Sequence, residues 1–178
     1  EDGHLRRLAS ISRDHSLGTV YSTLTFLLGM VPLEHEYKLM GMAPYADPDR
    51  ARVVADILHA YMPPPQGLTW QHAPKTPPAP LLYRYLREKL EFQRFDTIAA
   101  GVQIYLEEML LAWTGNAIRE TGIRRLALSG GVFMNVKANQ RLLDLPEVDE
   151  LFVFPSCGDE SNALGAAYWQ AAQRGDPG

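Results

Sequence analysis

The sequence predicts an α/β fold, because two segments near its C-terminal end share one pattern. In residues 125–135 the apolar run 126–128 leads into Ser129, Gly130 and Gly131, and a helix is expected at once. In residues 151–167 the apolar run 152–154 leads into the small-residue segment 155–159 and then a second helix, over about residues 161–173. Alternation of short apolar strands with helices is typical of an α/β sheet. Free N–H groups and the positive helix end gather where such a strand meets its helix, so both loops favour an anion or a nucleotide phosphate.

The N-terminal third predicts one strand and two helices. Residues 4–12 alternate loosely and predict a short edge strand after an Asp2-Gly3 turn. Residues 17–29 have apolar side chains at helical spacing, with Ser16 as the N-cap and Gly29 at the stop. Residues 34–45 lack a clean period and predict a loop or a short helical turn, whereas residues 47–61 predict a helix that starts at an Asp-Pro pair.

The middle of the chain predicts an irregular segment and then the longest helix. Residues 62–80 hold seven of the thirteen prolines, so we expect an excursion outside the core. Residues 81–90 predict a short helix. Residues 94–121 contain no proline and predict the central helix, which ends near Gly122. Its apolar stripe comprises Phe95, Ile98, Val102, Tyr105, Met109, Ala112 and Trp113.

Composition limits the classes of protein and partner. The 178 residues, 46% of them hydrophobic, suit one domain with a substantial core. A formal net charge of -4 without a Lys/Arg run argues against a nucleic-acid partner. A single cysteine, Cys157, excludes an internal disulfide and a cysteine-rich zinc site, and it suits a cytoplasmic location. The sequence has neither a signal-peptide pattern nor an apolar run near 20 residues, so no membrane association is expected.

The first glycine loop is a candidate nucleotide site. Gly130 and Gly131 lack Cβ atoms and can let a ligand approach the backbone closely, although a Gly-Gly pair is more often a simple tight turn. Asn135 can donate or accept a hydrogen bond with a ribose or phosphate, or it can cap its own helix, which is the commoner role.

Charged residues elsewhere also allow two interpretations each. Asp159 follows a predicted strand end, where a carboxylate can bind a metal or act as an N-cap. Lys38 lies with Glu36 in a charged run that is either a solvated loop or a means of neutralising a phosphate or carbamoyl anion. Cys157 has no neighbouring base in the sequence, which favours packing over nucleophilic chemistry, and the five histidines show no paired metal spacing.

Four ordered motifs together resemble the O-carbamoyltransferase family typified by nodulation enzymes and by enzymes that tailor cephalosporins and aminoglycosides. The motifs span almost the whole chain and are His15-Ser16-Leu17-Gly18 with Tyr21-Ser22, Glu36-Tyr37-Lys38-Leu39-Met40-Gly41-Met42-Ala43-Pro44-Tyr45, Leu128-Ser129-Gly130-Gly131-Val132-Phe133-Met134-Asn135, and residues 155–167. The second motif is the most distinctive. It ends in Tyr45-Ala46, where the family usually has a glycine after the tyrosine.

This resemblance implies a fold and a reaction. Family members are longer, and a YrdC-like C-terminal domain makes carbamoyl-adenylate from ATP and carbamoyl phosphate. Their N-terminal domain has an actin/hexokinase-like (ribonuclease-H-like) ATPase fold with a mixed sheet and flanking helices, and it passes the carbamoyl group to a hydroxyl acceptor. Residues 1–178 would be the second portion of that N-terminal domain. The family's paired metal-binding histidines would then lie upstream and the adenylate-forming domain downstream, so the segment alone is expected to be inactive.

The resemblance also assigns roles to individual positions. Gly130, Gly131 and Asn135 match the nucleotide-contacting loop, together with Ser129, and Asp159 matches the aspartate that helps to bind a divalent metal, typically Fe²⁺. Glu36 and Lys38 lie in the motif that borders the nucleotide cleft. We therefore expect the glycine pair and Asp159 to converge on one bound adenylate from adjacent strand ends.

Three other interpretations stay open at this point. A kinase-like or threonylcarbamoyl-transferase-like enzyme would use the same nucleotide cleft with different acceptor chemistry. A non-catalytic interaction domain would use the helix of residues 94–121 for a partner, and its glycine loops would be plain turns. A Rossmann dinucleotide domain is less favoured, because Gly130-Gly131 does not extend to the spaced triple-glycine fingerprint.

Overall fold

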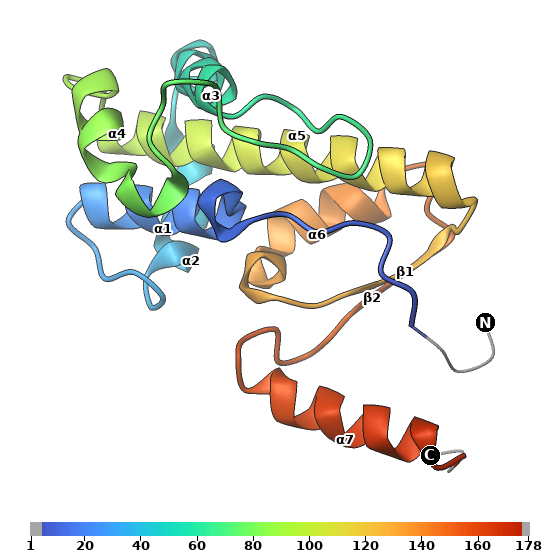
Figure 1. The fold of residues 1–178 in the computed structure, drawn as a ribbon. Coiled ribbons are helices and arrows are strands. Elements are labelled where there is room, and N and C mark those ends of the chain that lie inside the picture. Colours follow the sequence, from blue (N-terminus) through green and yellow to red (C-terminus); the bar gives the residue numbers. More distant parts are fainter. Residues whose placement is uncertain (1–4, 176–178) are drawn as a thin grey trace.

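The protein is a mixed α/β structure in which helices surround one long helix and a small parallel sheet lies to the side (Figure 1). This computed structural model describes residues 5–175. The helices are α1 (Leu17–Leu27), α2 (Glu36–Met42), α3 (Pro48–Tyr61), α4 (Tyr83–Lys89), α5 (Phe95–Thr121), α6 (Val136–Leu143) and α7 (Ser161–Gln173). The strands are β1 (Arg125–Leu128) and β2 (Glu150–Val153), and 3-10 turns occupy Arg13–His15, Ala43–Tyr45, Ala79–Leu81 and Gly131–Met134. None of the helices in the described part is long and apolar enough to cross a membrane.

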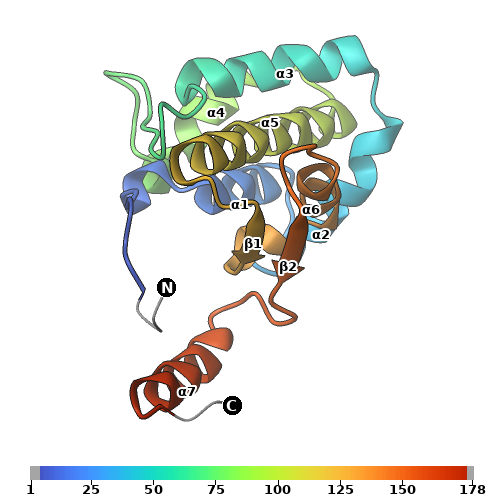
Figure 2. The same ribbon diagram turned by 90° about the vertical axis from the view of Figure 1, so that its right-hand side faces the viewer.

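Helix α5 is the centre of the fold, as the sequence predicts. Figures 1 and 2 show α3 and α4 on one side of it and α1, α2 and α6 on the other. Of the predicted stripe, Ile98, Val102, Tyr105 and Met109 are buried, Ala112 and Trp113 are half-buried, and Phe95 at the start of the helix is exposed. The helix ends at Gly122, whose φ of 71° is the left-handed C-cap conformation that glycine adopts without strain.

Helix α3 packs closely against α5. Asp47 caps α3 by accepting a hydrogen bond from the Arg50 N–H (3.0 Å), and Pro48 occupies its first turn, as predicted. The buried face of α3 includes Val54 and Leu58, and it meets α5 at Gly101, where a Cβ atom would lie 2.9 Å from the Ala51 carbonyl oxygen. The absence of a side chain at this position therefore sets how closely the two helices approach.

Residues 62–80 form no regular helix or strand before Ala79, as their prolines predict, and residues 63–78 include no fully buried residue. Met62 and Ala79 are fully buried, and Trp70 packs against the core cluster. The segment is tied to α5 by a hydrogen bond from Trp113 Nε1 to the Leu68 carbonyl (3.0 Å). The expectation of an excursion outside the core was therefore wrong only for Met62 and Ala79 at the two ends of the segment, because proline prevents helical hydrogen bonding without preventing apolar burial nearby.

The sheet consists of the two parallel strands β1 and β2, joined by the 3-10 turn Gly131–Met134 and helix α6. Leu128 is in register with Val153, so the C-terminal ends of both strands lie side by side. The described residues contain no antiparallel strand that would make the sheet mixed. Helix α7 has the predicted bounds but no buried residue, and Figures 1 and 2 both show it away from the other helices.

The predicted N-terminal strand is absent from the described residues of that segment. Residues 5–12 form no strand pairing, and Ser12 instead caps the turn Arg13–His15 by accepting a hydrogen bond from the Asp14 N–H. The Asp2-Gly3 turn lies outside the described residues. Within residues 34–45, positions 36–45 form the helix α2 and a following 3-10 turn, so the helical alternative of the prediction holds there.

Candidate functional site

Both predicted loops leave the sheet at the same edge. Residues 129–131 follow β1 and residues 154–160 follow β2, and the Phe154 N–H donates to the Leu128 carbonyl (3.0 Å) just beyond the paired strands. In open α/β sheets this edge is where ligands bind. The sequence therefore predicted the adjacency of the two loops correctly.

The glycine pair has open space around it. Gly130 has a φ of 112°, which favours glycine, and a Cβ atom at Gly130 or Gly131 would meet no other heavy atom within 4 Å. The pair also begins a tight turn, because the Phe133 N–H donates to the Gly130 carbonyl (2.9 Å). The loop is thus a turn whose backbone a ligand can reach.

Ser129 lines a groove of about 670 Å³ that the N-terminus of α1 shares with the first loop. The start of α1 and the first loop pack closely at the groove, since a Cβ atom at Gly18 would lie 3.3 Å from Val132 Cγ2. Ser16 caps α1 by accepting from the Thr19 N–H (3.2 Å), and the N–H groups of Leu17 and Gly18 donate to no acceptor within residues 5–175. A helix start with two free donors therefore faces the same groove as Ser129 and Val132, whereas Gly130 and Gly131 are not among the lining residues. The other lining residues are Ala9, Ser10, Ile11, Ser12, Arg13, His15, Leu68, Trp70, Leu110, Trp113 and Phe133.

The aromatic wall of this groove is held by hydrogen bonds. Trp70 Nε1 donates to the His15 carbonyl (2.8 Å), and the Trp70 and Trp113 rings meet edge to face at 5.4 Å. His15 Nδ1 accepts from the His72 backbone N–H (3.2 Å), which places the proton of the neutral ring on Nε2. His15, Ser16 and Gly18 were not predicted as site residues. The signal that could have found them is their place in the first family motif.

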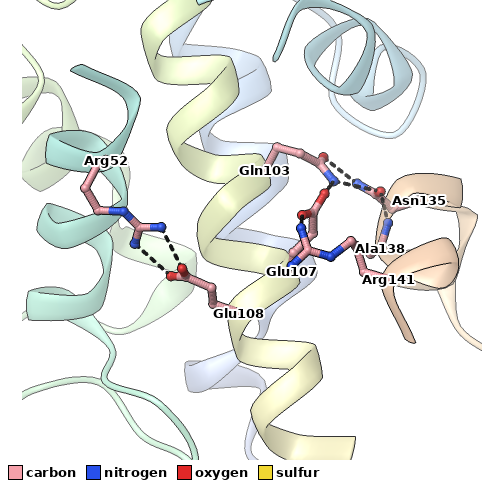
Figure 3. A network of polar contacts seen from close by, with 7 residues as sticks. All are labelled: Arg52, Gln103, Glu107, Glu108, Asn135, Ala138 and Arg141. Carbon is pink, nitrogen blue, oxygen red and sulfur yellow. Dashed lines mark hydrogen bonds and ion pairs between the residues drawn. The ribbon is translucent and has the colours of Figure 1, made fainter. Parts of the chain in front are cut away.

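Asn135 belongs to a polar network between α5 and α6 (Figure 3). Its Oδ1 accepts from the Ala138 N–H (3.0 Å), so Asn135 is the N-cap of α6. Its amide also pairs with the amide of Gln103, through Gln103 Nε2 to Asn135 Oδ1 (3.0 Å) and Asn135 Nδ2 to Gln103 Oε1 (2.8 Å). Gln103 is a buried polar residue that the sequence did not single out.

The structure does not bring Glu36 and Lys38 to the groove, whose lining within the described residues lies elsewhere. Glu36 Oε1 accepts from Ser22 Oγ (2.7 Å) and from the Leu33 N–H (2.7 Å), so this carboxylate ties α2 to α1. Lys38 is half-buried, and its Nζ lies 5.8 Å from the centre of the Tyr37 ring.

Asp159 is exposed on the second loop. Glu160 takes the N-cap position of α7 without a capping side-chain bond, so Asp159 is not the cap of that helix. Residues 5–175 contain no cluster of three or more His, Cys, Asp or Glu side chains able to hold a metal ion. One exposed carboxylate does not make a metal site, and the donor set of the described residues therefore does not fit a bound divalent ion on its own.

Cys157 packs inside this loop, as the sequence favours. The side chain is 4% exposed, and its Sγ donates to the Phe154 carbonyl (2.8 Å). Burial, and then the Glu160 carboxylate, raise the pKa of the thiol. A thiol with a raised pKa is a poor nucleophile at neutral pH.

Two loops at one edge of a parallel sheet, with a helix N-terminus beside the first of them, place the chain in the α/β class. Residues 1–168 match the family described as Carbamoyltransferase N-terminus, and the chain belongs to that family. It is 34% identical over 175 residues to the nodulation protein NolO of Bradyrhizobium diazoefficiens, covering 97% of this chain and 31% of that protein. It is 31% identical to the nodulation protein NolNO of Sinorhizobium fredii, over 96% of this chain and 25% of that protein.

A third relative is the uncharacterised protein sll1178 of Synechocystis, which is 33% identical over 86% of this chain and 27% of its own length. The chain thus spans between about a quarter and about a third of the length of each of these three curated relatives. The family resemblance predicted from the four motifs is confirmed.

Proposed function

We propose that this chain is the nucleotide-binding portion of an O-carbamoyltransferase. The complete enzyme transfers a carbamoyl group from carbamoyl-adenylate to a hydroxyl group of a small-molecule or glycan acceptor. The observation that carries the proposal is the groove in which the N-terminus of α1 meets Ser129, Val132 and Phe133, the residues on either side of the glycine pair. Free N–H groups and a positive helix end there suit the phosphate of an adenylate.

The proposed reaction joins the acceptor oxygen to the carbamoyl carbon, breaks the bond between that carbon and the adenylate phosphate oxygen, and releases the proton of the acceptor hydroxyl to solvent. Negative charge develops first on the carbamoyl oxygen and then on the departing AMP. Backbone donors fixed before the reaction stabilise such charge without reorganisation. In this proposal the Leu17 and Gly18 N–H groups and the glycine loop hold the adenylate, while the Trp70 and Trp113 wall covers its apolar side.

The wider proposal follows the family. ATP and carbamoyl phosphate would form the adenylate on a YrdC-like domain of the same polypeptide, in the cytoplasm, and the present chain would be one part of an actin/hexokinase-like domain with a mixed sheet. Glu36 and Lys38 would border the cleft from α2. Asp159 would supply one ligand to a metal, Fe²⁺ in this proposal, and no step above depends on that ion.

Calorimetric titration with ATP, and with a non-hydrolysable adenylate analogue, tests the nucleotide site. The variant Gly131→Val places a side chain in open space, so it should keep the fold and weaken ATP binding at least tenfold by blocking the backbone. Gly41→Val is the matched control, because Gly41 also has open space but lies on α2, which carries neither of the two loops. If the unaltered protein gives no binding heat, the proposal fails and the interaction-domain alternative gains support.

Asp159 has its own test in the complete enzyme. Asp159→Ala should lower both metal content and carbamoyl transfer, measured by elemental analysis and by product formation. Unchanged metal content would contradict the assignment of Asp159 as a ligand. Asp159→Asn keeps the size of the side chain and separates loss of charge from loss of shape.

A further inference from the structure

The side-chain amide of Gln103 is buried on α5, where most of the other buried residues are apolar. Only 5% of the residue is exposed, and its amide makes four hydrogen bonds to three side chains. Burying an amide costs free energy unless its donors and acceptor are satisfied, so an apolar residue would serve packing better here. The contacts instead converge on Asn135, which ends the glycine loop and begins α6.

We propose that Gln103 is a positioning residue that holds the Asn135 amide in place and occupies one acceptor and one donor position of it, so that Asn135 can only donate a hydrogen bond to the bound nucleotide. This inference rests on the proposed nucleotide site. It assigns a role to a residue that lies 32 positions before Asn135 in the sequence and on a different element.

The Ala138 N–H, which can only donate, and the Glu107 carboxylate, which accepts, determine how the Asn135 and Gln103 amides are oriented. The Ala138 N–H can only donate, so the atom of Asn135 that faces it (3.0 Å) is Oδ1. The Glu107 carboxylate accepts 2.7 Å away, so the atom of Gln103 that faces it is Nε2. Gln103 Oε1 then receives hydrogen bonds from Asn135 Nδ2 (2.8 Å) and from Tyr21 Oη (3.2 Å).

The remaining hydrogen-bonding capacity of Asn135 follows from this count. Both lone pairs of Oδ1 are taken, one by Ala138 N–H and one by Gln103 Nε2. One of the two Nδ2 protons goes to Gln103 Oε1, and the other has no acceptor within residues 5–175. Asn135 therefore offers a ligand one N–H donor, which suits a ribose or phosphate oxygen or an unprotonated ring nitrogen.

The network is also anchored on α6. Arg141 Nη1 lies 3.4 Å from Glu107 Oε2, and this ion pair draws the carboxylate toward the helix that Asn135 caps (Figure 3). Buried Tyr21 contributes from α1, and burial, followed by the charges of Glu36 and Glu107, raises the pKa of its hydroxyl, which stays protonated as a donor. Three helices thus meet at the amide pair.

The experiment is a double-mutant cycle on ATP affinity in the intact protein, measured by calorimetry. Gln103→Met keeps an unbranched side chain of similar length without hydrogen bonds, and it should weaken ATP binding about three- to tenfold. Asn135→Ala should weaken binding about tenfold, and Gln103→Met should then add no further loss. Full additivity of the two losses would overturn the inference, because Gln103 would then act independently of Asn135.

The matched control is Glu108→Gln on the same helix. Glu108 makes a two-bond ion pair with Arg52 on the α3 side of α5, away from the amide pair (Figure 3), so its loss should leave ATP affinity unchanged. If Gln103→Met and Glu108→Gln weakened binding equally, general loosening of α5 would explain both, and the positioning role would be refuted.

A second measurement does not require ATP. The side-chain NH₂ signal of Asn135, identified in nuclear magnetic resonance spectra by its loss in Asn135→Ala, should show one proton protected from exchange and one exposed. Gln103→Met should remove the protection. Absence of protection in the unaltered protein would overturn the inference about Gln103, whereas absence of ATP binding with intact protection would overturn the nucleotide proposal and the stated role together.

Discussion

Replacing Gly101 by alanine tests whether helices α3 and α5 are packed as closely as the structure shows. An added Cβ atom would lie 2.9 Å from the Ala51 carbonyl oxygen and closer still to Cβ and Cγ1 of Val54. None of these atoms is the end of a flexible side chain, so the helices would have to separate. Overpacking of this kind costs about 1–3 kcal/mol, and the fixed backbone contact favours the upper end of that range.

Alanine also favours helix over glycine by about 1 kcal/mol, so the expected net loss in the free energy of unfolding is about 2 kcal/mol. For a chain of this size that loss lowers Tm by about 4–8 °C, measurable by calorimetry or by circular dichroism. Gly115→Ala is the control on the same helix, because its Cβ would meet only the flexible end of Arg119 at 3.4 Å. It should gain up to about 1 kcal/mol. A Gly101→Ala protein as stable as the unaltered one would refute the close packing.

Three further predictions concern single side chains. Ser16→Ala removes the acceptor for the Thr19 N–H and should lower the free energy of unfolding by about 1 kcal/mol in urea titrations. Glu108→Gln should lower the urea midpoint at pH 7, and the deficit should shrink as the pH falls below about 4.5. The Arg52 hydrogen bond holds the pKa of the Glu108 carboxyl below its ordinary value in the folded protein. The stability that this hydrogen bond adds is therefore complete above the ordinary pKa, and it is lost as the pH falls and the Glu108 carboxylate of the folded protein is protonated. Cys157 should react slowly with Ellman's reagent in the folded protein and rapidly in urea, because its thiol is buried and has a raised pKa.

The ends of the helices were predictable because their signals are local. Ser16, Asp47 and Gly122 each stop or start a helix through a bond or a φ angle within a few residues. The loose alternation of residues 4–12 carried no such signal. A strand also needs a partner, and the described part of that segment has none, so the pattern alone misled.

The site was predictable only in part, for the same reason. Residues 129–131 and Asp159 follow strand ends, and parallel pairing of β1 with β2 brings those ends together. Gln103, by contrast, meets Asn135 only because α5 and α6 pack, and nothing in the local sequence distinguishes it from a solvent-exposed glutamine. The groove similarly joins Gly18 to Val132 across more than a hundred residues. Tertiary contacts of this kind leave no periodic trace.

The two loops at the sheet edge differ in how firmly the fold holds them. A two-stranded sheet is marginal by itself, so each loop depends on the helix that follows it. Helix α6 buries Ala138 and Leu142 and is tied to α5 through Asn135, which fixes the first loop. Helix α7 buries none of its side chains, and its Tyr168 is 69% exposed. The described residues therefore fix the glycine loop from both ends, whereas Asp159 is held only through β2, and this difference favours the glycine loop as the place to test ligand binding first.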